Sequence, residues 1–250
     1  MTESSLRPHH ARMRGVVTGA GSGIGRSCVE LFSRHSILVE AWDLQPEHRL
    51  ESDGLSEVTR RTVDVTDEDS VRTAAAAAMA EGDIDFLVNS AGMFLLDELA
   101  TVPIPEVKTL FDVNVVGTSI VTQSLLPALQ ASRGSVVNIA STVAIRSSAS
   151  NSHYSASKAA VAHLTRCWAR ELAPRVRVNA VAPGPTNTPL FRTAGMTDTE
   201  ESAMLASRAA ANPMGRLGQP DEIADWIGRF AVEASWITGA VLPIDGGMSL

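Results

Sequence analysis

Short runs of β-branched residues alternate with longer segments rich in alanine and leucine along nearly the whole chain. This alternation predicts repeated strand–helix–strand units, which build a parallel sheet covered by helices on both faces. Seven strands are expected, at residues 15–17, 37–42, 61–64, 86–89, 135–140, 176–181 and 241–243. The predicted fold is therefore α/β: one doubly wound Rossmann-type domain over residues 13–250, preceded by a flexible N-terminal tail at residues 1–12.

Helical segments are predicted where a capping residue or a proline precedes an Ala/Leu-rich stretch. They begin near Ile24, Ser70, Pro105, Ser152 and Asp221. The third is expected to cover residues 105–130, and the fourth residues 152–172. These helices serve as the crossovers that return the chain between parallel strands.

Two segments lack the pattern of a regular helix. Residues 44–60 are polar and contain Pro46 and Gly54, so only a short or degraded helix is expected there. Residues 188–217 are rich in threonine, alanine and methionine, have weak helical periodicity, and are interrupted by glycine and proline. We expect residues 188–217 to form a mobile lid over the substrate, with a plain surface excursion as the alternative.

The charge balance argues against two kinds of partner. The chain has 28 acidic and 21 basic residues and a formal net charge of -7, which gives no attraction to nucleic acid or anionic lipid. No stretch approaches ~18 uninterrupted apolar residues, and the first dozen residues lack the apolar centre of an export signal. Since Cys28 and Cys167 are far apart in sequence, a reduced cytoplasmic protein that does not span a membrane is expected.

A glycine-rich turn, TGAGSGIG, occupies residues 18–25 between the first predicted strand and the first helix. Glycine permits the tight reversal and lets the backbone approach a pyrophosphate, while the helix N-terminus presents N–H groups to it. The spacing is not that of the common G-x-G-x-x-G string, so an ordinary flexible loop is the alternative. The cofactor-binding residues predicted in this turn are Gly19, Gly21, Ser22, Gly23, Ile24 and Gly25.

An acidic residue, Asp43, ends the second predicted strand about two dozen residues after the first glycine. At that place a carboxylate can accept hydrogen bonds from both ribose hydroxyls of an adenosine, whereas a 2′-phosphate would be repelled. Asp43 therefore favours NAD over NADP. Arg26 and the more remote Arg49 leave NADP as the second possibility.

The only tyrosine of the chain, Tyr154, stands four residues before Lys158, one of only two lysines. In a helix this spacing puts the two side chains on one face. A neighbouring ammonium favours the phenolate, so we expect Lys158 to lower the pKa of Tyr154 toward the range useful for acid/base catalysis. Such a pair also occurs by chance, which is the alternative for the spacing taken alone.

Together, Thr18-Gly19-x-x-x-Gly23-x-Gly25 and Tyr154-x-x-x-Lys158 resemble the short-chain dehydrogenase/reductase family in its classical form, and the resemblance extends from about Arg14 to the C-terminus. The usual Asn-Asn-Ala-Gly of that family reads Asn-Ser-Ala-Gly here. The further matching motifs are Asp64-Val65, Asn89-Ser90-Ala91-Gly92, Asn114 in NVVG, Ser141 in NIAS, Pro183-Gly184, Thr238-Gly239 and Asp245-Gly246-Gly247.

The resemblance implies a set of four catalytic residues. Tyr154 would be the general acid/base, and Ser141 would bind the substrate oxygen and steady its developing charge. Lys158 would also bind the nicotinamide ribose. Asn114 resembles the asparagine that holds a water linking the lysine to solvent.

The resemblance also implies cofactor contacts beyond the glycine turn and Asp43. Those beside the adenine would be Asp64 and Val65. The contacts along the ribose, the diphosphate and the nicotinamide would be Asn89, Ala91, Gly92, Tyr154, Lys158, Val181, Pro183, Gly184, Thr186 and Thr188.

The expected substrate contacts are mostly apolar, which indicates a compact and partly apolar alcohol or carbonyl compound. Ordinary core packing is the alternative for each of them, and for His153 a structural histidine is the alternative. The set comprises Met93, Phe94, Val143, Ala144, Ile145, His153, Pro185, Phe191 and Met196. No His/Cys/Asp cluster has metal-ligand spacing, so no metal is expected.

The expected function is NAD(H)-dependent hydride transfer to or from a secondary alcohol or ketone carbon. Two alternatives stay open: an NADPH-dependent ketoreductase of 3-oxoacyl or polyketide substrates, and a non-catalytic scaffold that senses nucleotides. The family resemblance further implies a homotetramer, or a homodimer, joined through the helices at residues 105–130 and 152–172.

Overall fold

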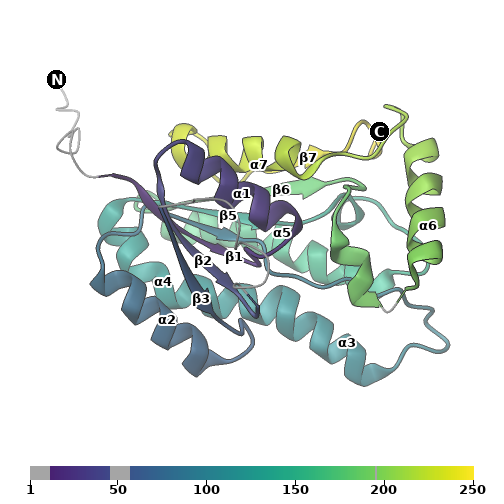
Figure 1. Ribbon diagram of the computed structural model, residues 1–250, viewed down its shortest axis with the longest axis horizontal. Helices are drawn as coiled ribbons and strands as arrows, with labels where there is room; N and C mark the ends of the chain where they lie inside the picture. The colour runs from purple at the N-terminus through teal and green to yellow at the C-terminus, as the bar shows by residue number, and fades with distance from the viewer. Residues whose placement is uncertain (1–11, 46–56, 195) are drawn as a thin grey trace.

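Seven parallel strands form one sheet in the order β3-β2-β1-β4-β5-β6-β7 in the computed structural model (Figure 1), which describes residues 12–45, 57–194 and 196–250. The expected seven-stranded doubly wound sheet is thereby confirmed. Its strands are β1 (Arg14–Thr18), β2 (Leu38–Asp43), β3 (Val58–Thr62), β4 (Phe86–Asn89), β5 (Ser135–Ile139), β6 (Arg177–Pro183) and β7 (Val241–Ile244).

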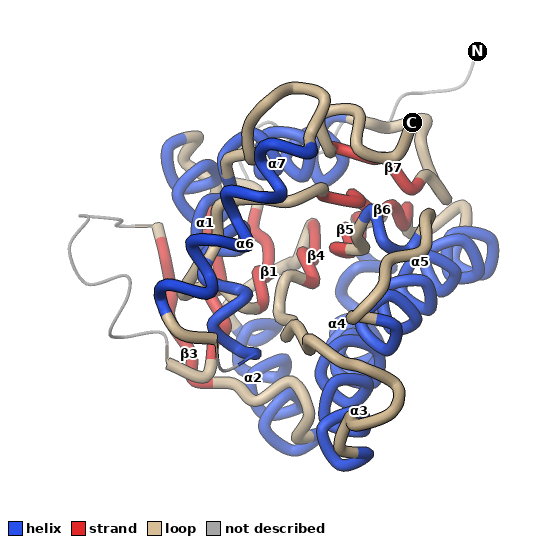
Figure 2. The backbone as a smooth tube through the Cα atoms, turned by 90° about the vertical axis from the view of Figure 1, so that its right-hand side faces the viewer, coloured by secondary structure: helices blue, strands red, loops and turns tan. Residues whose placement is uncertain are grey.

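Helices cover both faces of the sheet, as Figure 2 shows. On one face α1 (Gly23–Arg34) packs beside α7 (Pro220–Gly228), and their apolar side chains form one core layer with the strands. On the other face α2 (Glu68–Ala80), α4 (Thr118–Ser132) and α5 (Ser152–Leu172) form the second layer. Because a parallel sheet needs such cover, its strands are nearly continuous apolar runs.

The third predicted strand is displaced along the sequence in the structure. The third strand was expected at residues 61–64, but β3 occupies Val58–Thr62, paired in parallel with β2 from Val39 opposite Val58. Its residues are exposed or half-buried at the edge of the sheet, so no hydrophobic pattern marks them. The expected N-terminal tail and the degraded helix lie mostly outside the described residues.

The structure divides the single helix expected at residues 105–130 into three successive helical segments. It begins as α3 (Ile104–Phe111), continues as a π-helical segment η1 (Asp112–Gly117), and ends as α4. Single-turn π segments often occur at functional sites because they rotate the side chains that follow. Here the segment contains Asn114.

The segment 188–217 contains a regular helix that the weak periodicity failed to predict. Helix α6 (Asp198–Ala211) begins with a capping box, in which the Thr197 hydroxyl accepts from the Glu200 amide and the Glu200 carboxylate accepts from the Thr197 amide. Met204 and Leu205 of α6 pack against a small apolar cluster that includes Tyr154. The segment therefore contributes apolar side chains to the cluster that includes Tyr154.

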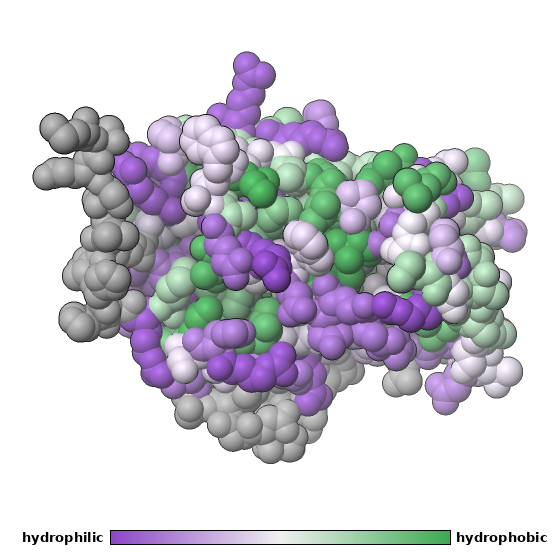
Figure 3. Space-filling model, turned by 90° about the horizontal axis from the view of Figure 1, so that it is seen from above, coloured by the Kyte–Doolittle hydropathy of each residue, from purple (hydrophilic) through white to green (hydrophobic). Residues whose placement is uncertain are grey.

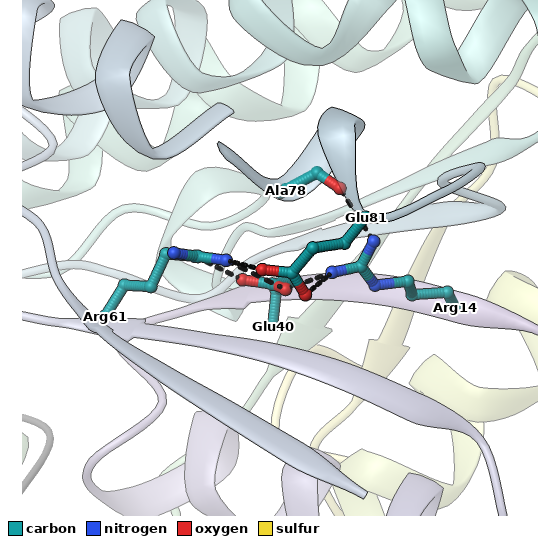
Figure 4. A network of polar contacts seen from close by, with 5 residues as sticks. All are labelled: Arg14, Glu40, Arg61, Ala78 and Glu81. Carbon is teal, nitrogen blue, oxygen red and sulfur yellow. Dashed lines mark hydrogen bonds and ion pairs between the residues drawn. The ribbon is translucent and has the colours of Figure 1, made fainter. Parts of the chain in front are cut away.

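A buried ion-pair network joins the first three strands to α2 (Figure 4). The side chain of Glu40 on β2 is fully buried and pairs with Arg14 of β1 and with Arg61 of β3, the latter at 2.7 Å. Glu81, which caps α2, closes the network by pairing with both arginines. Arg14 also donates to the Ala78 carbonyl at 2.6 Å. Every charge in this network has a partner, as buried charges require.

No helix among the described residues is long and apolar enough to cross a lipid bilayer.

Candidate active site

A cavity of about 1110 Å³ opens at the carboxyl ends of the strands, where the sheet order reverses between β1 and β4. Ligands of doubly wound folds bind at this topological switch point. The β1–α1 turn and the end of β2 line one part of the cavity. The ends of β5 and β6, together with residues of α5 and α6, line the other part.

The glycine turn adopts a backbone that other residues would strain. Gly19 and Gly23 have φ values of +62° and +51°, and a Cβ on Gly19 would lie 2.8 Å from the backbone of Ala91. Helix α1 starts at Gly23 with no side-chain cap and no acidic residue in its first turn. Its first N–H groups are therefore available for an anionic diphosphate, and the turn fits a dinucleotide.

Asp43 lies against this turn, at the end of β2. Its carboxylate accepts hydrogen bonds from the Gly21 amide at 2.9 Å and the Gln45 amide at 3.0 Å. The side chain is thus held at the cavity edge, where it suits ribose hydroxyls. Arg26 pairs with Glu30 at 2.7 Å, and Arg49 lies outside the described residues.

Most residues expected to bind the cofactor line the cavity, namely Gly19, Ser22, Gly23, Ile24, Asp43, Asp64, Val65, Ala91, Gly92, Tyr154, Lys158, Pro183, Gly184, Thr186 and Thr188. Gly21, Gly25, Asn89 and Val181 are not part of the lining. Gly25 allows helix α1 to lie close to the turn, because a Cβ at this position would lie 2.2 Å from the Gly19 carbonyl oxygen.

Asn89 is directed into the core instead of the cavity. Its amide nitrogen donates to the Thr122 hydroxyl at 3.0 Å and to the Asn138 side-chain oxygen at 2.9 Å. Asn138 in turn donates to Thr165 of α5 at 2.9 Å. This buried series of hydrogen bonds ties β4 and β5 to α4 and α5.

Tyr154 and Lys158 occupy successive turns at the start of α5, and both are buried. The ammonium of Lys158 donates to the Ile139 carbonyl at 2.9 Å and lies 5.9 Å from the centroid of the Tyr154 ring. The tyrosine hydroxyl shares a hydrogen bond with Ser141, which follows β5. The hydroxyl pair and the ammonium therefore meet on one wall of the cavity.

The protonation of the pair differs from the expectation. Burial raises the pKa of Tyr154 to about 12, although the Ser141 hydrogen bond and the charge of Arg208 act in the opposite direction. Burial also lowers the pKa of Lys158 to about 8. The expected lowering of the tyrosine pKa by the lysine is wrong for the protein alone, because removing the phenolate from water outweighs the nearby positive charge.

Asn114 is fully engaged through its side chain. It accepts from the Met93 amide at 2.9 Å, and it donates to the Met93 carbonyl at 3.0 Å and to the Ser157 hydroxyl at 3.1 Å. A Cβ on Gly92 would lie 3.2 Å from the Asn114 oxygen and 3.5 Å from the Lys158 nitrogen. Asn114 thus holds the strand end beside Lys158 without lining the cavity itself.

Of the expected substrate contacts, Met93, Phe94, Val143, Pro185 and Phe191 line the cavity. His153, Ala144, Ile145 and Met196 are not part of the lining. The imidazole of His153 pairs instead with the buried carboxylate of Asp97 at 2.5 Å. This contact holds the imidazole against Asp97.

Two arginines in the lining were missed by the sequence analysis. Arg208 comes from α6, and Arg146 follows β5 and donates to the Met248 carbonyl. The Thr-x-x-Glu capping signal at Thr197 could have revealed α6 and the face that carries Arg208. No comparable signal marks Arg146.

A dinucleotide turn that shares one cavity with a buried Ser–Tyr–Lys set defines an oxidoreductase that acts on CH–OH groups with a nicotinamide cofactor. The model of the family described as enoyl-(acyl carrier protein) reductase matches residues 19–249. The chain belongs to the short-chain dehydrogenase/reductase family, as its motifs indicated.

Three similar proteins illustrate the range of this family. The 3-oxoacyl-(acyl-carrier-protein) reductase FabG of Thermotoga maritima is 37% identical, with 93% of this chain and 96% of the relative covered. The cis-4-hydroxycyclohexanecarboxylate dehydrogenase of Sinomonas cyclohexanicum is 36% identical, covering 93% and 94%. The crystal structure of 3-ketoacyl-(acyl-carrier-protein) reductase from Brucella melitensis complexed with NADH has a TM-score of 0.86 at 30% identity, covering 95% and 98%.

Proposed function

We propose that this oxidoreductase uses NAD(H) to interconvert a small secondary alcohol and the corresponding ketone, with Tyr154 as the general acid/base. The observation that carries the proposal is the buried Ser141–Tyr154 hydrogen bond, next to Lys158, in the cavity that the glycine turn also lines. Bound NAD+ would accept the hydrogen of the carbinol C–H bond as a hydride. A non-catalytic scaffold would have no need for this arrangement.

The four proposed catalytic residues have separate roles. Tyr154 takes the hydroxyl proton during oxidation and returns it to the carbonyl oxygen during reduction. Ser141 donates a hydrogen bond to that oxygen. Lys158 supplies positive charge near the phenol and the nicotinamide ribose, and Asn114 positions the Gly92–Met93 backbone beside it.

Replacing Tyr154 with phenylalanine tests the chemistry directly. Tyr154→Phe removes the only phenol while keeping the ring that packs edge-on against Phe94 at 4.9 Å. We expect kcat to fall about 10²- to 10⁴-fold, the range attributed to a positioned acid/base, with the thermal midpoint nearly unchanged. Steady-state kinetics on any accepted alcohol measure the loss. Full activity in a folded variant would refute the role of Tyr154.

The preference for NAD is proposed from Asp43, whose carboxylate is fixed by two backbone amides at the ribose end of the cavity. A 2′-phosphate there would face a like charge. Asp43→Asn is expected to raise KM for NAD+ about tenfold, by removing a charged acceptor, and to improve use of NADP+. Kinetics with both cofactors measure the change. A wild-type preference for NADPH would favour the ketoreductase alternative, to which the FabG similarity also points.

Three further proposals concern the oligomeric state, the cellular location and the segment 188–217. We propose a homotetramer, since large apolar side chains remain exposed, and a cytoplasmic location, since Cys28 and Cys167 are both free. The segment 188–217 is proposed as a substrate lid because its helix α6 supplies Arg208 and Ala211 to the cavity.

A further inference from the structure

The charged residues that line the cavity are divided between its two ends. The acidic ones lie at the nucleotide end, where Asp43 is the last residue of β2 and Asp64 follows β3. The basic ones are Lys158, which lies next to Tyr154, Arg208 on α6, and Arg146, which donates to the Met248 carbonyl. The substrate end of the lining therefore carries positive charge and no carboxylate.

Arg208 is the residue in this set without a protein acceptor. Its guanidinium lies over the ring of Phe191, 4.8 Å from the centroid, and 5.8 Å from the centroid of Phe94. Within the described part of the chain it forms no hydrogen bond or ion pair with a carboxylate or carbonyl. The half-buried cation is thus stacked on two aromatic faces with its N–H donors unused.

Stacking compensates for only part of the hydration that such a cation loses. Cation–π contacts are individually weak, whereas the five guanidinium N–H donors of an arginine ordinarily find acceptors. Arg146, by contrast, donates to the Met248 carbonyl, and Lys158 donates to the Ile139 carbonyl. Arg208 is therefore the cation of the substrate end that is free to bind a ligand anion.

We propose that Arg208 binds a carboxylate on the substrate, so that the enzyme acts on a small hydroxy acid or keto acid. The inference rests on the proposed function and adds the substrate class to it. A guanidinium that stacks on aromatic rings keeps its planar edge free for a two-pronged contact with a carboxylate. Met93, Leu190 and Pro185, which also line this end, would contact the apolar carbon skeleton.

The geometry limits the size of that skeleton. The guanidinium of Arg208 and the ring of Tyr154 both contact Phe94, at 5.8 and 4.9 Å from its centroid. Arg208 and Tyr154 are thus neighbours of one ring, and the charge of Arg208 acts on the tyrosine, so one small molecule can reach both. A hydroxycyclohexanecarboxylate carries a carbinol and a carboxylate on one such small skeleton, whereas a neutral sugar would leave Arg208 unpaired.

A binding experiment tests the proposal without any turnover. Cyclohexanecarboxylate and cyclohexanecarboxamide, which have no carbinol to oxidise, would be added to the NAD+-saturated protein while its thermal midpoint is followed. We expect the carboxylate to raise the midpoint and to bind at least tenfold more tightly than the amide, because a charged hydrogen-bond pair is lost with the amide. Equal binding of the two would overturn the proposal.

Variants then assign the effect to Arg208. Arg208→Met should abolish the preference for the carboxylate, and Arg208→Lys, which retains the charge, should keep part of it. Arg72→Met is the matched control, since Arg72 is an exposed arginine on α2 paired with Glu68, and its loss should leave the preference intact. A preference that survives in folded Arg208→Met would overturn the assignment.

Kinetics separate this inference from the proposed function. The hydroxycyclohexanecarboxylates and their amides would be compared with cyclohexanol as NAD+-dependent substrates. We expect about a 10- to 100-fold higher kcat/KM for the acids, and Arg208→Met should remove this difference mainly through KM. Oxidation of the neutral alcohols without preference for the acids would overturn the inference alone. Absence of alcohol oxidation despite selective carboxylate binding would overturn the proposed function alone.

Discussion

At the scale of single residues, the protonation of Tyr154 is set by its burial. The four-residue spacing to Lys158 predicts a charge that favours the phenolate, and the two side chains do share a helix face. Yet the ammonium is itself desolvated, which lowers the pKa of Lys158 to about 8, while the phenol is raised to about 12. Without cofactor the phenol of Tyr154 therefore keeps its proton at neutral pH. This is the protonation state that the proposed reduction of a carbonyl requires.

Because Tyr154 is the only tyrosine, its titration can be observed without interference from other phenols. A free tyrosine is about half ionised at pH 10. In the cofactor-free protein we expect ultraviolet difference spectra to show little phenolate at that pH, because the native pKa is raised. Addition of NAD+, which is positively charged at the nicotinamide, should lower the pKa. The Tyr154→Phe variant provides the blank, and half-ionisation at or below pH 10 in the free protein would contradict the burial argument.

At the scale of elements, the network around Glu40 holds three strands and a helix in register. Glu40 faces the layer of α2, so β1, β2 and β3 each contribute one charged side chain to a site that the end of α2 covers. Burying these charges is costly unless all are paired. The residues of the edge strand β3 are exposed or half-buried, so few apolar contacts hold this strand. Its Arg61 adds an ion pair to the buried Glu40 of β2.

Glu40→Gln should therefore be strongly destabilising. The substitution keeps the shape but leaves two arginines beside a neutral group, and we expect a loss of about 3 kcal/mol in the free energy of unfolding. Denaturant-induced unfolding followed by circular dichroism measures it. Glu81→Gln is the matched control, because the Glu81 side chain is 49% exposed and its loss should cost less than about 1 kcal/mol. Similar losses for both variants would show that burial does not decide the effect.

At the scale of the whole molecule, one group of exposed apolar side chains lies on α7 and the segment that follows it. Trp236 is 98% exposed, and Trp226 and Ile237 are also open to solvent. In the view from the side of α7, apolar areas reach the surface among polar ones (Figure 3). Monomers rarely leave such residues uncovered together. This end is thus a second candidate contact between subunits, in addition to the helices at residues 105–130 and 152–172.

Light scattering should give a solution mass of four times the 26.5 kDa of one chain. We expect Trp236→Asp to reduce that mass to a dimer or monomer, because a charge would be buried against the partner. Val116→Asp tests the surface expected from the helices at residues 105–130 and 152–172, because Val116 is 46% exposed on η1. A monomeric wild-type protein would contradict the tetramer.

The sequence by itself determined the parts of the protein whose chemistry is local. The glycine turn, Asp43 and the Tyr154–Lys158 spacing each lie within one turn, strand end or helix, so their geometry follows from backbone rules that act over a few residues. The order of these segments was enough to predict the doubly wound sheet. The family motifs then supplied Ser141 and Asn114, which no local pattern would have joined to the tyrosine.

Only the tertiary structure decided which residues meet across the cavity. It turned Asn89 into the core, paired His153 with Asp97, and brought Arg208 from α6 against Phe94 and Phe191. It also raised the pKa of Tyr154 instead of lowering it. The physical reason is common to all of these, because burial and stacking depend on atoms from elements far apart in the chain. The proposed catalytic pair was found from its spacing, but its protonation and its position near Arg208 depend on packing that no short stretch of sequence encodes.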